Sequence, residues 1–174
     1  MLVIGIFLFS FTVVSFAQTT NNQITKQEII TAQKNWGDGI VLIGKVYSDG
    51  GDYRKEALNF INKFYAYQYG PVLFKPTKAL EKQFRLNKES ALSYFVDGNK
   101  KIPEDKGFAL HPWIKIQFQN AGFFIHGDYA VAMGKYFFTP QKGKIVEVEY
   151  TFGYIKDKDG NLKINLHHSS LPYK

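Results

Sequence analysis

Two histidines and two serines stand together near the end of the chain, as His167, His168, Ser169 and Ser170. They continue residues 162–166, in which apolar and polar side chains alternate as they do in a β-strand. Because the run begins as apolar core, some of the polar groups that extend it should point into a cavity. Imidazole and hydroxyl groups placed there could hold an oxygen-rich ligand or move a proton.

Strand geometry divides this group of four. Neighbouring strand residues point to opposite faces, so the two histidines are poorly placed to chelate one metal ion together. We expect His168 and Ser170 to face the cavity, and His167 and Ser169 to face solvent or a partner subunit. Positions i and i+2 lie about 7 Å apart along a strand, which is long for a nucleophilic Ser–His pair. The chain also lacks the G-x-S-x-G elbow of serine hydrolases.

Carboxylates are not placed for acid–base work. We expect all 15 acidic residues, Glu104 and Asp105 among them, to lie in turns, on helix surfaces or beside lysines. Glu147 and Glu149 share one strand face, which we expect to be solvated. The buried face of that strand would then consist of Val146, Val148, Tyr150 and Phe152. An isomerase or dehydratase that needs a buried carboxylate is therefore a weaker alternative.

Composition narrows the class further. The chain of 174 residues has no cysteine, which excludes disulfides, thiolate chemistry and Cys-ligated zinc. Its net charge of +7 comes mainly from scattered lysines, with Arg54 and Arg85 as the two arginines. Nucleic-acid sites favour clustered basic residues, so we expect no nucleic-acid partner. The positive field can still attract small anions.

The N-terminal segment has its own character. Residues 1–17 carry no charged side chain and end in Ser-Phe-Ala, which predicts a secretory signal peptide cleaved near Ala17. A membrane anchor is the alternative, but the apolar run is short for a full span. Residues 18–23 are a polar linker, and residues 24–174 are expected to form a single domain. We therefore predict an exported protein, periplasmic or secreted, without a stable membrane anchor.

Helical patterns fill the first half of that domain. Thr25 and Glu28 form a capping-box pattern that opens a helix through about Tyr47. Residues 37–39, Gly-Asp-Gly, should kink that helix or allow close packing. A second helix begins at Asp52, with one apolar face formed by Ala57, Phe60, Ile61, Phe64 and Tyr65. A short strand over 72–74 and a third helix over 87–97 follow.

The second half has strand periodicity. We predict strands over 114–125, 129–138, 145–155 and 162–169, separated by turn residues. Helices followed by long antiparallel strands are typical of the α+β class, with helices covering one face of a curved sheet.

Four side chains remain as candidates for chemistry. Thr77 follows the short strand, Tyr94 lies on the third helix, and His168 and Ser170 lie on the last strand. Each also has a structural explanation. Thr77 would cap a helix over 78–83, Tyr94 and His168 would be core residues, and Ser170 would be a turn residue.

The chain ending over 165–172, N-L-H-H-S-S-L-P, resembles the H-H-S-S-x-P signature of the iota-class carbonic anhydrases. That family is related to the calcium/calmodulin-dependent kinase II association domain, within the NTF2-like superfamily. The segments 72–77 and 107–110 and the pair Tyr94-Phe95 are similar to it as well, and the likeness runs from about Trp36 to Pro172. Leu171 departs from the methionine often expected there, a volume-conserving change.

The resemblance implies an NTF2-like cone that forms homodimers or larger assemblies and hydrates CO2 reversibly to bicarbonate. It favours a metal-free enzyme, with zinc or manganese, described in other members, left open. Thr77, Tyr94 and Ser170 match the positions that contact bicarbonate, and His168 would orient water or accept its proton. The alternative is a non-catalytic module of the same fold that assembles or binds a small ligand.

Overall fold

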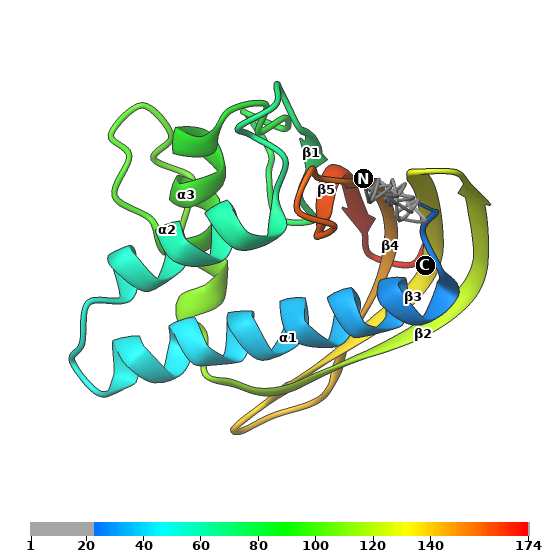
Figure 1. Cartoon of the computed structure of the whole chain (residues 1–174). Helices are drawn as coiled ribbons and strands as arrows, with labels where there is room; N and C mark the ends of the chain where they lie inside the picture. Colours follow the sequence, from blue (N-terminus) through cyan, green and yellow to red (C-terminus); the bar gives the residue numbers. More distant parts are fainter. Residues whose placement is uncertain (1–22, 174) are drawn as a thin grey trace, which may run out of the picture.

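The computed structural model describes residues 23–173, which form helices packed on one face of a curved sheet (Figure 1). The predicted signal peptide and nearly all of the linker lie outside the described residues. Within the described part of the chain, no helix is long and apolar enough to cross a membrane. The predicted α+β class is confirmed.

Helix α1 (Lys26–Ser48) begins at the predicted capping box, where Thr25 and Glu28 satisfy each other's backbone N–H groups. Its glycines leave the helix unbroken and allow close packing. A Cβ atom at Gly37 would lie 3.2 Å from the Ile116 Cβ, and one at Gly39 would lie 2.6 Å from the Phe60 ring. The helix therefore lies close against both β2 and α2.

Two shorter helices cover the remaining core. Helix α2 (Tyr53–Phe64) is capped by Asp52 and buries the predicted apolar face. Helix α3 (Lys88–Val96) is capped by Asn87, whose side chain accepts a hydrogen bond from the Ser90 N–H at 2.9 Å. Figure 1 shows α2 and α3 beside each other at one end of α1.

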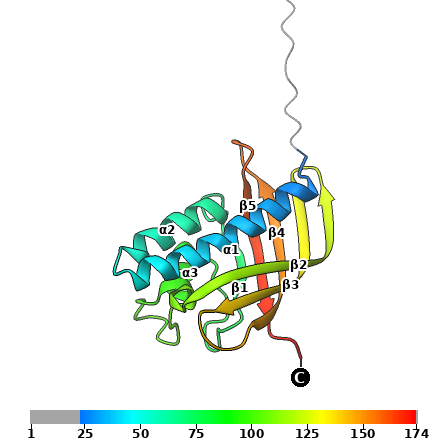
Figure 2. The ribbon, with the colours of Figure 1, turned by 90° about the horizontal axis from the view of Figure 1, so that it is seen from below.

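The sheet has the order β1-β5-β4-β3-β2. Its strands are β1 (Leu73–Lys75), β2 (Trp113–His126), β3 (Tyr129–Pro140), β4 (Val146–Lys156) and β5 (Leu162–Ser170). A 3-10 turn, η1 (Phe108–Leu110), precedes β2. Figure 2 shows α1 lying across the strands. The expected antiparallel sheet is in fact mixed, because β1 pairs in parallel with β5 and places Phe74 beside His167.

The core is strongly aromatic and centres on Trp36. Five rings have centroids 5.6–6.0 Å from it, those of Phe60, Phe118, Tyr136, Phe152 and His167. All five pairs are tilted or edge-on, and the ring quadrupoles favour such arrangements over face-to-face stacking. Strand β5, which contains His167, therefore runs through the centre of the core.

A β-bulge interrupts β5. Tyr154 pairs with Ile164, but the preceding residue of β4, Gly153, pairs with Leu166, so Asn165 is an extra residue on β5. One extra residue reverses the face of every side chain that follows it. Beyond the bulge, His167 and Ser169 lie on the inner face with Ile164.

Candidate functional site

The structure overturns the predicted orientation of the His-His-Ser-Ser segment. His167 and Ser169 are each 3% exposed and line an internal cavity, whereas His168 is exposed. Ser170 lies on the outer face and donates a hydrogen bond to the Glu149 carboxylate at 3.1 Å. The prediction assumed regular alternation from Ile164 onward, and the bulge at Asn165 shifts that alternation by one residue.

A signal for this bulge was present in the sequence. Gly153 stands between the aromatic residues Phe152 and Tyr154, and glycine inside a strand often marks a bulge or a close approach. A Cβ atom there would lie 2.6 Å from the Asn165 Oδ1 and 2.9 Å from the Leu166 Cβ. Glycine on β4 therefore makes room for the extra residue on β5.

The cavity is small and has an aromatic wall. Its volume is about 40 Å³, room for roughly three water-sized groups. Aromatic and aliphatic side chains make up most of its lining: Trp36, Phe95, Phe108, Trp113, Phe138, Val146, Val148 and Leu171. Thr77, Tyr94, Tyr136, His167 and Ser169 provide polar side chains in the same lining. Such a site suits a ligand of three or four heavy atoms with an apolar body and polar ends.

Hydroxyl groups converge at one side of this cavity. Thr77 Oγ1 donates to Ser169 Oγ at 2.9 Å, and both hydroxyls also hydrogen-bond to the Tyr136 hydroxyl. The parallel pairing of β1 with β5 brings Thr77 here, because Thr77 follows β1 by two residues. The predicted placement of Thr77 and Tyr94 at one cavity is therefore correct. Residues 78–83 form no helix, so Thr77 does not act as a helix cap.

Both cavity tyrosines are held in their protonated form. Burial raises the pKa of Tyr94 and of Tyr136 above the usual value near 10. The Tyr94 hydroxyl also forms a hydrogen bond with the Lys78 backbone. At neutral pH each hydroxyl therefore keeps a proton that it can donate.

His167 is almost fully buried and has contacts around most of its ring. Its Nδ1 lies 2.9 Å from the Tyr65 hydroxyl and its Nε2 lies 3.4 Å from the Tyr136 hydroxyl. The ring stacks on Phe74 at a centroid distance of 4.4 Å and meets Phe152 edge-on at 4.3 Å. Burial, reinforced by the neighbouring His168, lowers the pKa of His167 well below 6.5, so the imidazole is neutral.

The loop that carries Thr77 is held by Glu104. The Glu104 carboxylate accepts hydrogen bonds from three successive backbone N–H groups, those of Leu80, Glu81 and Lys82, at 2.7–3.1 Å. Desolvation acts to raise the pKa of Glu104, but these N–H groups and Arg85 outweigh it and lower the pKa to about 2. The carboxylate thus stays charged and fixes the loop beside the cavity.

A buried ion pair lies behind that loop. Arg85 and Asp105 are both fully buried at the side chain and are 2.8 Å apart. We expected Asp105 to lie in a turn, on a helix surface or beside a lysine, but the structure buries its side chain, where Arg85 compensates its charge away from water. Its second oxygen accepts a hydrogen bond from Ser93, so both oxygens already have partners.

The cavity opens toward a wider cleft of about 720 Å³. The two spaces share five lining residues: Lys78, Tyr94, Phe108, Trp113 and Val146. The cleft continues past His111 and Asp97, both exposed. The shared lining places this cleft directly beside the inner cavity.

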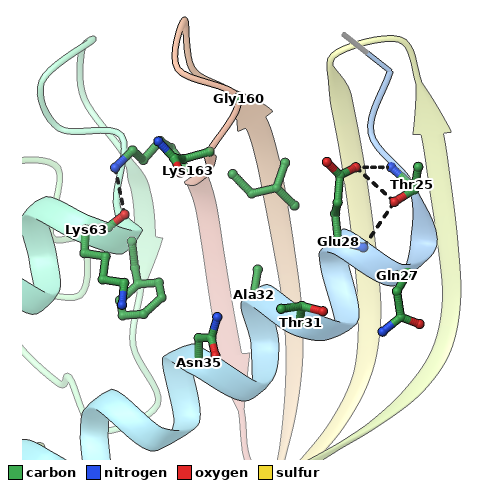
Figure 3. A pocket seen from close by; sticks show the side chains of 12 residues that line it. Thr25, Gln27, Glu28, Thr31, Ala32, Asn35, Lys63, Gly160 and Lys163 are labelled. Atoms are coloured by element: carbon green, nitrogen blue, oxygen red, sulfur yellow. Dashed lines mark hydrogen bonds between the residues drawn. The ribbon is translucent and has the colours of Figure 1, made fainter. Parts of the chain in front are cut away.

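A second groove, of about 500 Å³, runs between α1, the end of α2 and the β4–β5 turn (Figure 3). Its principal polar groups already have partners. Lys163 donates to the Lys63 carbonyl at 2.8 Å, and Glu28 belongs to the capping box and pairs with Lys156.

No group of three or more His, Cys, Asp or Glu side chains placed to hold a metal ion occurs among residues 23–173. His167 and His168 lie on opposite faces of β5, as strand geometry predicts for neighbours.

Comparison with known proteins defines the class. The model of the metal-independent carbonic anhydrase family matches residues 27–171. A metal-independent carbonic anhydrase from Nostoc sp. strain PCC 7120 is 45% identical over 157 residues, which cover 88% of this chain and 77% of that protein. The chain therefore belongs to the metal-independent carbonic anhydrase family.

Solved structures agree with that membership. The iota-carbonic anhydrase of a cyanobacterium, in complex with bicarbonate, superposes with a TM-score of 0.87 at 42% identity, covering 95% of this chain and 99% of that one. A putative calcium/calmodulin-dependent protein kinase II association domain from Xanthomonas campestris gives a TM-score of 0.60 at 18% identity, covering 97% and 99%. The second likeness shows a shared fold. The predicted membership in the carbonic anhydrase family is confirmed.

Proposed function

We propose that this chain catalyses the reversible hydration of CO2 to bicarbonate, without a metal, in the cavity that Thr77 and Ser169 line. Membership in the metal-independent carbonic anhydrase family supports the activity. The related cyanobacterial enzyme binds bicarbonate. The observation that carries the proposal is the cluster of hydroxyl donors inside a 40 Å³ aromatic cavity.

The chemistry suits this environment. CO2 is linear and apolar, so it can leave water for a pocket walled by rings at little cost. When the water oxygen bonds to carbon, one C=O electron pair moves onto oxygen, which becomes negative. The proton that the water loses leaves through the cleft to a base in solvent. Donors already aimed at the developing charge stabilise it without rearranging.

Three hydroxyl groups are assigned to this role, those of Tyr94, Tyr136 and Ser169, while Thr77, which donates its one proton to Ser169, orients the Ser169 hydroxyl. Each donor contributes about 3 kcal/mol if it behaves like one donor of an oxyanion hole. The bulge turns His168 and Ser170 outward. Ser169 therefore takes the place expected for Ser170, and His167 is the histidine at the cavity instead of His168.

Stopped-flow CO2 hydration by the chelator-treated protein tests the proposal. We expect activity to persist in chelator and to fall about 100-fold or more in Thr77→Val, which keeps the shape of the side chain but removes the hydroxyl. An inactive wild-type protein, both in chelator and with added zinc or manganese, would leave the non-catalytic alternative as the better account.

We also propose export, on the strength of residues 1–17. N-terminal sequencing of the protein recovered from the expressing cells tests it, with Gln18 as the expected first residue.

A further inference from the structure

Three buried side chains form a hydrogen-bonded series, and two of them, Trp36 and His167, also line the cavity. The Trp36 Nε1–H donates to the Tyr65 hydroxyl at 3.1 Å, and that hydroxyl lies 2.9 Å from His167 Nδ1. The three residues are 1–3% exposed. The Trp36 N–H is bonded to Tyr65, and Tyr65 is not part of the cavity lining, so these polar atoms need another explanation.

Donor accounting fixes the direction of these bonds. The indole N–H can only donate, so the Tyr65 oxygen accepts from it. The Tyr65 hydroxyl then has one proton of its own to place, and among the described residues His167 Nδ1 is the acceptor recorded for it. Because a buried donor left without a partner is costly, the hydroxyl donates to Nδ1. A neutral imidazole that accepts at Nδ1 must have its proton on Nε2.

We propose that Tyr65, oriented by Trp36, is a positioning residue that holds His167 as the Nε2–H tautomer, so that the imidazole donates a hydrogen bond toward the cavity. The inference rests on the proposed function for its catalytic meaning, but the tautomer itself is independent of any activity. His167 then works with the hydroxyl groups as a donor to the bicarbonate-like oxygens or to Tyr136. It does not take the proton from water, the role first expected of the neighbouring His168.

The packing supports a fixed ring. Phe74 stacks on one face of the imidazole and Phe152 meets it edge-on, while Trp36 lies 5.7 Å away. A 180° ring flip would put Cδ2 in the place of Nδ1 and Cε1 in the place of Nε2, so the Tyr65 and Tyr136 hydroxyls would lose their nitrogen partners. The Nε2–H tautomer satisfies both contacts at once.

The tautomer can be observed directly by ¹⁵N NMR of protein with labelled histidine, through the two-bond correlations of the His167 ring. We expect Nδ1 to resonate as an unprotonated nitrogen and Nε2 as a protonated one. A wild-type spectrum with a proton on Nδ1 would overturn the proposal, and this measurement needs no variant to fold.

Two matched variants then test the role of Tyr65. Tyr65→Phe removes the donor to Nδ1, whereas Tyr67→Phe removes a hydroxyl that donates to the Arg85 carbonyl on the same segment. We expect Tyr65→Phe to mix the tautomers and to lower kcat about 10- to 100-fold with a smaller change in KM. Tyr67→Phe should keep the wild-type tautomer and kcat. A folded Tyr65→Phe protein with the wild-type tautomer and kcat would refute the proposal.

The two proposals fail separately. If the wild-type protein has no CO2 hydration activity but its His167 tautomer changes in Tyr65→Phe, the positioning role stands and the proposed function falls. If activity is present and Nδ1 is protonated, the proposed function stands and the positioning role falls.

Discussion

Adjacent residues at the end of β5 have opposite environments. Ser169 is 3% exposed and bonds to Thr77, whereas Ser170 bonds to Glu149 on the outer face. His167 and His168 differ in the same way. Similar side chains one position apart therefore provide internal controls for each other.

The burial of His167 predicts how stability depends on pH. In the unfolded chain its pKa returns to about 6.5, and burial holds the folded value well below that. As the pH falls below about 6.5, the unfolded chain binds a proton that the folded chain does not. The free energy of unfolding should then fall by up to about 1.4 kcal/mol for each pH unit.

Urea unfolding at several pH values between about 5 and 8 measures this slope. We expect His167→Gln to reduce the slope of the unfolding free energy against pH by the equivalent of about one bound proton. His168→Gln changes the exposed neighbour and should retain the wild-type slope. Equal slopes in the wild type and His167→Gln would show that His167 titrates normally in the folded protein.

At the scale of elements, the bulge in β5 determines which side chains reach the cavity. A methyl group at Gly153 would lie 2.6 Å from Asn165 Oδ1 and 2.9 Å from the Leu166 Cβ. The amide can move but the Leu166 Cβ cannot move without its backbone. We therefore expect Gly153→Ala to destabilise the fold by about 1–3 kcal/mol, the usual cost of overpacking.

Gly122→Ala is the matched control, because a methyl group at Gly122 meets nothing within 4 Å. Thermal or urea unfolding of the two variants measures the difference, and CO2 hydration reports whether His167 and Ser169 have shifted. If Gly153→Ala is as stable as Gly122→Ala, the close approach of β4 to the bulge does not constrain the strand.

Much of this fold could be predicted from the sequence because its signals are local and periodic. The capping box at Thr25 and the apolar spacing after Asp52 locate α1 and α2. The placement of Thr77 and Tyr94 at the cavity, implied by the family resemblance, was also correct.

Three features could not be predicted from periodicity. The bulge depends on the contact of Asn165 with Gly153 on the neighbouring strand β4. The parallel pairing of β1 with β5 depends on the path that the chain takes after α2. The buried Asp105 depends on Arg85, twenty residues away. Each is a tertiary contact, which sequence spacing does not encode. Regular alternation along the strand therefore places His168 on the inner face, although His167 is the histidine buried there.

At the scale of the whole molecule, the outer face of the sheet remains apolar in places. Phe124 is 64% exposed and Met133 is 53% exposed, and both point away from α1. Exposed apolar patches on a sheet are typical of surfaces that bind another protein. We propose that a second copy of the chain covers this face, in keeping with the predicted homodimer.

Light scattering during size-exclusion chromatography tests that assembly. We expect the Phe124→Lys/Met133→Lys double variant to elute as a monomer, since a charge at the centre of an interface must be desolvated. Leu42→Lys, on the exposed side of α1, should leave the mass unchanged. A wild-type protein that is monomeric at high concentration would contradict the proposed dimer.

The most direct test of the account compares the two serines in CO2 hydration by chelator-treated protein. We predict that Ser169→Ala lowers kcat about 100- to 1,000-fold, because it removes one preorganised donor from the cavity. Ser170→Ala should stay within about threefold of the wild type, because its hydroxyl faces Glu149 on the outer surface. The reverse result, a severe loss in Ser170→Ala and near-normal activity in Ser169→Ala, would contradict the assignment of the cavity as the active site.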